Sequence, residues 1–332
     1  MGSTYERGLQ LSRRLGDRKH SFSLLSGAWG FHIVRGQLEE SRRLAQDCVD
    51  EASRDDVPAL EMAGHFLLGT SLFYLGQLAA AREHMEQAVA AYGGPSPPAL
   101  ALFAAPDAGV LSRAYLSHLL WLSGHAGQAA ARSQEAIALA RELSHPFSLV
   151  IALQYAAILD VLRQDGKGAL ARAAEASAVC RKYGLEYYVS WSEVLVGWAS
   201  AVEGETAAGL AQIRHGLDLL KARGSELLRP FYHGLLAEVC GVAGQAGEAL
   251  ASIASAFAFQ SKNRELWSAP VLHRIHGDVL LRSGAASEAQ ISYQRALESA
   301  QQMGAPMLER RAADRLREMR TAGDVRRKAT ER

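Results

Sequence analysis

The chain has 332 residues, 48% of them hydrophobic, and a formal net charge of +1. This apolar content is enough for a large buried core, and near-neutrality excludes recruitment of nucleic acid or an anionic membrane by a global field. Cys48, Cys180 and Cys240 form no C-x-x-C pair, and neither an apolar run of roughly 18 residues nor a signal peptide is visible. We therefore expect a protein without disulfides or structural zinc in the reducing cytoplasm.

The first residues already show a repeating character. Positions 4–16 (TYERGLQLSRRLG) match the second helix of a later helix pair, SYQRALESAQQMG at 292–304. We expect 4–16 to be the trailing helix of a truncated repeat, whose first helix has been lost or lies in another domain.

From there a glycine recurs between two helical segments, about every 40 residues. Seven residues before, five after and twelve after these glycines, only Trp29 and Leu159 among 21 positions are not Gly, Ala, Ser or Cys. Helices approach to about 8–10 Å only where the side chains at their crossing are small, so each glycine marks the turn of a helix–turn–helix unit. The turn glycines are Gly36, Gly76, Gly124, Gly166, Gly204, Gly244 and Gly284.

This period predicts an all-α fold, a right-handed superhelix (α-solenoid) of about seven helix–turn–helix repeats of about 40 residues. The whole chain, 1–332, is one repeat domain. A capping helix is expected at 305–321 and a flexible tail at 322–332. The repeats are expected at 21–52, 58–92, 110–142, 146–183, 186–223, 229–262 and 268–304.

The long connection at 92–110 interrupts the period. It begins with a Gly/Pro-rich stretch and contains an apolar run at 99–105, which is too hydrophobic to lie free in solvent. We expect it to fold back onto the array. It is either a lid over a ligand or a packing excursion that fills a gap between repeats.

Motifs for catalysis are missing from the sequence. Asp165 to Gly168 contains a Gly-Lys pair but neither the upstream glycine nor the Ser/Thr of a phosphate-binding loop. No H-E-x-x-H helix and no G-x-S-x-G turn occurs. We therefore predict no catalytic residue, no cofactor and no metal, and the arginines, balanced by acids along the chain, do not favour nucleic acid.

The first helix of each repeat is expected to line the concave inner face. Projection of these helices gives an aromatic and apolar groove with a few polar points, which suits an apolar helix, an extended hydrophobic peptide or a flat small molecule. Alternatively, several of these rings pack between neighbouring first helices. The inward-facing candidates are Phe66, Phe73, Tyr74, His118, Trp121, Tyr155, Trp191, Trp198, Phe231 and Glu238.

The pattern L-G-x-x-L-x-x-x-G-x-x-x-x-A at 68–81 resembles the tetratricopeptide repeat (TPR) superfamily. Segments such as RGQLEESRRLAQ (35–46) and SQEAIALARELSHPFSLVIAL (133–153) are similar to the C-terminal repeats of bacterial AAA/STAND ATPase–nucleotide cyclase regulators and related multidomain proteins. No cyclase or ATPase motif of that family is present. The resemblance therefore implies the role of the repeats alone, which is sensing, autoinhibition or partner docking.

Three functional hypotheses follow. The first is a non-catalytic regulatory scaffold that binds a protein or peptide partner in the concave groove. The second is a small-molecule sensor with an apolar or aromatic ligand in a pocket under the 92–110 loop. The third is a repurposed enzyme that uses His118 or Glu238 as an acid or base.

Overall fold

The computed structural model describes residues 5, 7, 8, 11, 12, 14, 18–55, 57–94 and 106–330, and within them the chain is helical without any strand. The all-α repeat fold is thereby confirmed. The helices are α2 (Arg18–Val34), α3 (Leu38–Asp55), α4 (Pro58–Tyr74), α5 (Leu78–Ala90), α6 (Ala108–Leu122), α7 (Ala126–Glu142), α8 (Pro146–Arg163), α9 (Gly166–Tyr183), α10 (Glu186–Val202), α11 (Thr206–Ala222), α12 (Arg229–Val242), α13 (Ala246–Asn263), α14 (Ala269–Arg282), α15 (Ala286–Met303) and α16 (Pro306–Thr330).

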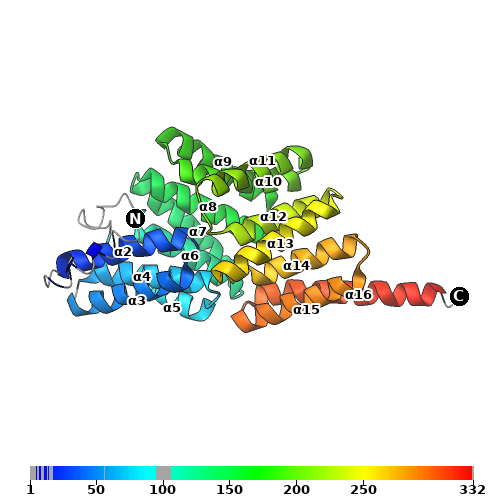
Figure 1. Cartoon of the computed structure of the whole chain (residues 1–332), viewed down its shortest axis with the longest axis horizontal. Helices are drawn as coiled ribbons and strands as arrows, with labels where there is room; N and C mark the ends of the chain where they lie inside the picture. Colours follow the sequence, from blue (N-terminus) through cyan, green and yellow to red (C-terminus); the bar gives the residue numbers. More distant parts are fainter. Residues whose placement is uncertain are drawn as a thin grey trace.

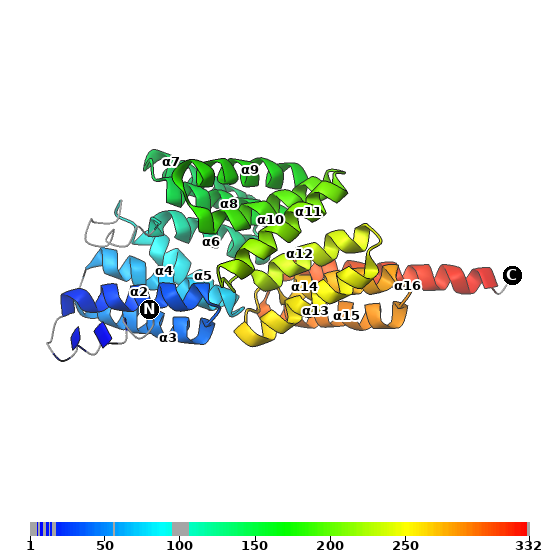
Figure 2. The same cartoon turned by 45° about the horizontal axis from the view of Figure 1, so that its top comes forward.

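Helix pairs stack side by side into a superhelix (Figures 1 and 2). The even-numbered helices from α4 to α14 contact one another in succession and form the inner layer, whereas the odd-numbered helices pack outside them. Helix α8 is long and apolar enough to cross a membrane by length and composition, but 78% of it is buried inside the structure. Its apolar surface is covered by neighbouring helices, as in the core helix of a soluble repeat protein.

Local chemistry explains where the helices begin. Proline occupies the first turn of α4, α8, α12 and α14, where its missing N–H needs no partner. Asp165 caps α9, because its carboxylate accepts the backbone N–H of Gly168 at 2.9 Å. The Gly-Lys pair of this segment therefore belongs to a helix start.

The small residues lie where the two helices of a repeat touch. In the pair α10/α11, a Cβ added to Gly197 would stand 2.7 Å from the carbonyl oxygen of Gly209, and one added to Gly209 would stand 2.4 Å from that of Gly197. The two backbones are in direct contact, which only glycine permits.

One turn assignment was wrong. In the fourth repeat the left-handed turn residue is Gln164, with φ 62°, and Gly166 is the first residue of α9. With this shift the turn residues recur every 40 residues from Gly124 to Gly284. Leu159 then no longer stands as an exception, because the contact positions become Ala157, Ala169 and Ala176, all fully buried.

Helix α16 continues to Thr330, past the end expected near Thr321, and projects beyond the stacked pairs (Figure 1). Of the expected trailing helix at 4–16, the described residues 5, 7, 8, 11, 12 and 14 are helical. The apolar run of the 92–110 connection, as part of residues 95–105, lies outside the described residues.

The superhelix closes tightly on itself. The backbone N–H of Glu226 donates to the carbonyl of Val34 at 3.0 Å, and the N–H of Leu266 donates to the carbonyl of Tyr74 at 2.8 Å. In both contacts the end of an early inner helix meets a loop between two later repeats. We call this line of contact between successive superhelical turns the seam.

Candidate functional site

The ten predicted inner-face residues lie in the interior of the protein, and they do not form an open groove. None of the nine ring-bearing candidates exposes more than 7% of its surface, and Glu238 exposes 17% of its side chain. They fall into three groups, which line a cavity, fill the closed axis or join an ionic cluster at the C-terminal end.

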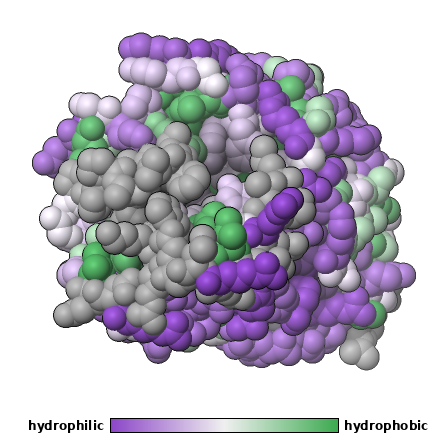
Figure 3. Space-filling view, turned by 60° about the vertical axis from the view of Figure 1, so that its left-hand side comes forward, coloured by the Kyte–Doolittle hydropathy of each residue, from purple (hydrophilic) through white to green (hydrophobic). Residues whose placement is uncertain are grey.

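Phe66, Tyr155 and Trp191 line the cavity. It has a volume of about 560 Å³, within the range of about 300–1,000 Å³ that is usual for small-molecule sites. It lies at the N-terminal end of the molecule, and Figure 3 shows on this face a hollow with pale residues inside it and some green, hydrophobic residues nearby. The other main lining residues are Trp29, Gly30, Phe31, Val34, Thr70, Leu111, Tyr115, Ile151, Tyr187, Tyr188 and Leu227.

Trp191 stands at the centre of the aromatic wall. Its ring centroid lies 5.5 Å from that of Tyr188, 6.0 Å from that of Tyr187 and 6.4 Å from that of Tyr155. Only 3% of Trp191 is exposed, and apart from a weak interaction with the hydroxyl of Tyr187 its indole Nε1 has no hydrogen-bond partner among the described residues. An indole N–H can only donate, so this wall offers one hydrogen bond to an acceptor.

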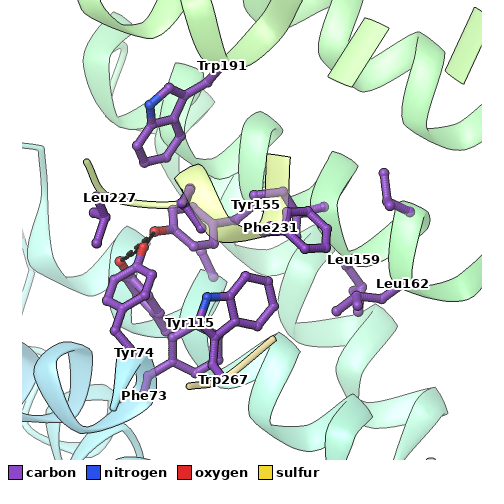
Figure 4. Packing of buried hydrophobic residues seen from close by; sticks show 14 of the residues in the cluster. Phe73, Tyr74, Tyr115, Tyr155, Leu159, Leu162, Trp191, Leu227, Phe231 and Trp267 are labelled. Carbon is purple, nitrogen blue, oxygen red and sulfur yellow. Dashed lines mark hydrogen bonds between the residues drawn. The ribbon is translucent and has the colours of Figure 1, made fainter. Parts of the chain in front are cut away.

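Three tyrosine hydroxyls meet beside the cavity. The hydroxyl of Tyr155 lies 2.5 Å from those of Tyr74 and Tyr115, which are 3.0 Å from each other (Figure 4). Each hydroxyl can donate once and accept, so the ring of three satisfies itself. Burial raises the pKa of all three phenols well above the ordinary value. The cluster is therefore a neutral, rigid support for the cavity.

The second group fills the axis below the cavity. Phe73 stacks on Trp267 at 5.2 Å, and Trp267 lies 5.0 Å from Phe231. Figure 4 shows these rings gathered below and beside the tyrosines. Trp267 belongs to the loop of the second superhelical turn, so the space expected to be an open groove is occupied by the chain itself.

His118 belongs to this covered interior as well. It is fully buried, and its Nε2 lies 2.7 Å from the carbonyl oxygen of Tyr155, an acceptor that requires the proton on Nε2. Burial lowers the pKa of His118 to about 4, so the ring is neutral. Because His118 does not line the cavity, its geometry gives no support to a role as an acid or base.

The third group lies near the C-terminal helices. Glu238 accepts hydrogen bonds from Trp198 Nε1 at 2.9 Å and from Arg274 at 2.8 Å. Burial opposes ionisation of Glu238, but the charge of Arg274 and these two hydrogen bonds hold its pKa below the ordinary value. Trp121 lies nearby under the guanidinium of Arg311, 5.1 Å from its ring centroid.

The wall of the cavity is aromatic, with isolated hydrogen-bonding groups and no acid–base pair among the residues that line it. Within the described part of the chain, no group of three or more His, Cys, Asp or Glu side chains is placed to hold a metal ion.

Sequence reasoning missed several lining residues. Projection of the first helices did not select Tyr115, Tyr187 or Tyr188, although the aromatic run of Tyr187, Tyr188 and Trp191 at the start of α10 is visible in the sequence. It also left out Trp29, whose Nε1 donates to the hydroxyl of Ser71 at 2.9 Å. Trp29 had been noted only as an exception to the small-residue pattern.

Known proteins give two kinds of similarity. No family model matches the chain. An uncharacterized protein of Rhizobium meliloti (strain 1021) is 23% identical over 323 residues, which cover 95% of this chain and 31% of that protein. The chain thus spans about a third of the length of this curated relative.

Solved structures share the fold. The chain matches a Rap protein complexed with Competence and Sporulation Factor with a TM-score of 0.65 and 12% identity, over 90% of this chain and 85% of the other. The apo form of RapI matches with a TM-score of 0.58 and 12% identity, over 84% and 97%. The chain has a TPR-like helical-repeat fold. At this identity the likeness concerns the fold alone.

Proposed function

We propose that the protein is a non-catalytic sensor scaffold whose cavity binds a flat, largely apolar small molecule that carries a hydrogen-bond acceptor. The observation that carries this proposal is the aromatic cavity of about 560 Å³, whose wall contains the poorly partnered Nε1 of Trp191. Leaving a buried donor unpaired costs about 1–3 kcal/mol, so an acceptor on the ligand would relieve a cost that the protein already carries.

The preference for a small ligand over a helix or a long peptide rests on the seam. Phe73, Tyr74 and Phe231, which would contact a long partner in an open groove, are covered by the second superhelical turn. The space that the seam leaves open is the compact aromatic cavity.

We place this scaffold in the cytoplasm as a regulatory module of a larger signalling protein. The three free, buried cysteines favour a reducing compartment, and the greater length of the curated relative supports the multidomain setting.

A cavity-filling substitution tests the ligand site. Gly30 lies on α2 and lines the cavity, and no heavy atom of the described residues lies within 4 Å of the Cβ position that a larger residue would use. In Gly30→Leu the new side chain occupies the cavity. We expect at least a tenfold loss of affinity for 8-anilinonaphthalene-1-sulfonate, an aromatic probe with acceptor oxygens, measured by its fluorescence. The melting temperature should not fall, since leucine is the better helix former.

Gly247→Leu is the matched control, because Gly247 is also helical, has open space at its Cβ position and lies outside the cavity. This variant should bind the probe like the unmodified protein. Trp191→Phe removes the donor and keeps a ring, so it should weaken binding about tenfold. Unchanged probe binding in Gly30→Leu would remove the basis of the proposal.

A peptide or protein partner that inserts one aromatic side chain into the cavity is the second candidate. It is supported by the similarity of this fold to a Rap protein that was solved with Competence and Sporulation Factor. In that case Gly30→Leu would abolish co-purification of the partner, and a metabolite screen would give no thermal shift.

A further inference from the structure

A second, smaller cavity of about 220 Å³ lies far from the aromatic one, between the end of α8 and helices α14 and α16. It is polar and contains three arginines. Its lining residues are Gln164, Arg274, Arg311, Asp314, Arg315 and Glu318.

Two of the arginines are fully engaged with carboxylates. Arg274 contacts Glu238 at 2.8 Å and Asp278 at 2.6 Å. Arg315 contacts Asp278 at 3.0 Å and Glu318 at 2.9 Å. These side chains form a network in which each charge has a partner.

The acidic side chains on the rim are also engaged. Asp314 pairs with Arg317, and Glu318 pairs with Arg315. Neither carboxylate is left to neutralise the third arginine of the cavity.

Arg311 is the exception in this network. No carboxylate of the described residues lies within ion-pair distance of it, and its guanidinium is held over the ring of Trp121. Burial, together with the charge of Arg274, lowers the pKa of Arg311 to about 10, and the charge of Glu238, which lies beyond ion-pair distance, opposes this only in part. A half-buried cation beside another cation is unfavourable, and a cation–π contact of about 0.5–2 kcal/mol offsets this only in part.

We propose that Arg311 anchors a second binding site, which takes the carboxylate of a small monoanion. The planar guanidinium matches a carboxylate through two parallel hydrogen bonds. Asp314 and Glu318 at the rim would repel a second negative charge, which disfavours phosphate and dicarboxylates. The site is independent of the ligand proposed for the aromatic cavity.

Acetate is the probe for this site. Thermal melts at pH 7 in sodium acetate are compared with melts in sodium chloride of equal ionic strength. At ten times the Kd of acetate the ratio of folded to unfolded protein should rise about tenfold relative to chloride. Sulfate and phosphate should give no specific rise.

Arg311→Met keeps an unbranched apolar stem over Trp121 and removes the charge. It should fold with no loss of melting temperature in chloride and lose the acetate effect entirely. Arg310→Met, a neighbouring exposed arginine on the same helix, should keep it. No acetate effect in the unmodified protein, an equal effect in Arg311→Met, or an equal effect of phosphate would each overturn the proposal.

The same melts identify the source of the carboxylate. If Gly-Gly-Ala with a free C-terminus stabilises the protein more than acetate, and its amidated form does not, the site takes the end of a peptide chain. If acetate is the better ligand, the site takes a free acid. Both results require Arg311, and a peptide effect that survives in Arg311→Met counts against the site.

Discussion

Glu265 is a fully buried carboxyl group at the seam, and no cation of the described residues lies within ion-pair distance of it. Its two oxygens accept the backbone N–H of Leu228 and the indole N–H of Trp267, both at 3.1 Å. These hydrogen bonds favour the carboxylate, but burial outweighs them and raises the pKa of Glu265 to about 8.

The raised pKa makes stability depend on pH. Between the ordinary carboxyl pKa and about 8 the unfolded chain has lost this proton while the folded protein keeps it. The contribution of Glu265 to stability is therefore greatest in acid and falls as pH rises, by about 1.4 kcal/mol per pH unit within this window. Denaturant titrations from pH 5 to 9 measure the free energy of unfolding of the wild type and of Glu265→Gln. As pH rises, the value for the wild type should fall relative to that of the variant. Parallel curves would show that Glu265 ionises normally.

For single residues, the sequence predicted which face of a helix a side chain occupies better than it predicted what that side chain contacts. The helical period brought Phe66, Tyr155 and Trp191 to the inner face, and they line the cavity. The same reasoning selected Phe73, but not the ring of Trp267 that covers it. The helical period of the sequence carries no information about contacts between residues so far apart in the chain.

Turn glycines with the same conformation have different surroundings. Gly36 and Gly244 have φ of 69° and 74°. A Cβ on Gly36 would lie 2.5 Å from the buried amide of Asn263 across the seam, whereas a Cβ on Gly244 would meet no atom of the described part of the chain within 4 Å.

This contrast predicts unequal effects of one substitution. Gly244→Ala should cost about 1–2 kcal/mol, which is the strain of a left-handed alanine. Gly36→Ala should lose a further 1–3 kcal/mol or so, because the buried Asn263 must move. Urea unfolding of the two variants measures the difference in stability. Equal losses would show that Asn263 can move aside without a cost in stability.

The helix pairs could be predicted from the sequence because the same pattern of small residues at helix contacts recurs in each repeat. Small residues at three fixed offsets from a turn need no long-range information. The error in the fourth repeat arose because Gln164 takes the left-handed conformation that glycine usually takes, while a true glycine, Gly166, stands two residues later. A non-glycine residue with positive φ cannot be recognised by residue type.

At the scale of the whole molecule, the seam adds a feature that simple solenoids lack. In an open solenoid each repeat touches only its neighbours, and stability is nearly a sum of local terms. Here Val34 and Tyr74 bond to residues roughly 190 positions later, a little under five repeats along the chain. The first repeats should therefore unfold together with the last ones.

Hydrogen exchange can test this coupling. Trp267→Ala removes a buried ring that contacts Phe73 across the seam, so amide protection should fall in α4 as well as in α14. Tyr293→Ala is the control, because Tyr293 belongs to a separate small cluster with Ala289 and Leu316. It should loosen α14 to α16 and leave α4 protected. Equal loss of protection in α4 in both variants would contradict a specific role of the seam.

The seam also has a consequence for biosynthesis. Phe73 and Tyr74 are in place once α4 has formed, but the loop that contacts this end of α4 across the seam lies roughly 190 residues further along the chain. At about 5–20 residues per second, the ribosome needs about 10–40 s to deliver that loop. During this interval the nascent chain presents an uncovered aromatic surface, which makes it a natural client for chaperones at the ribosomal exit.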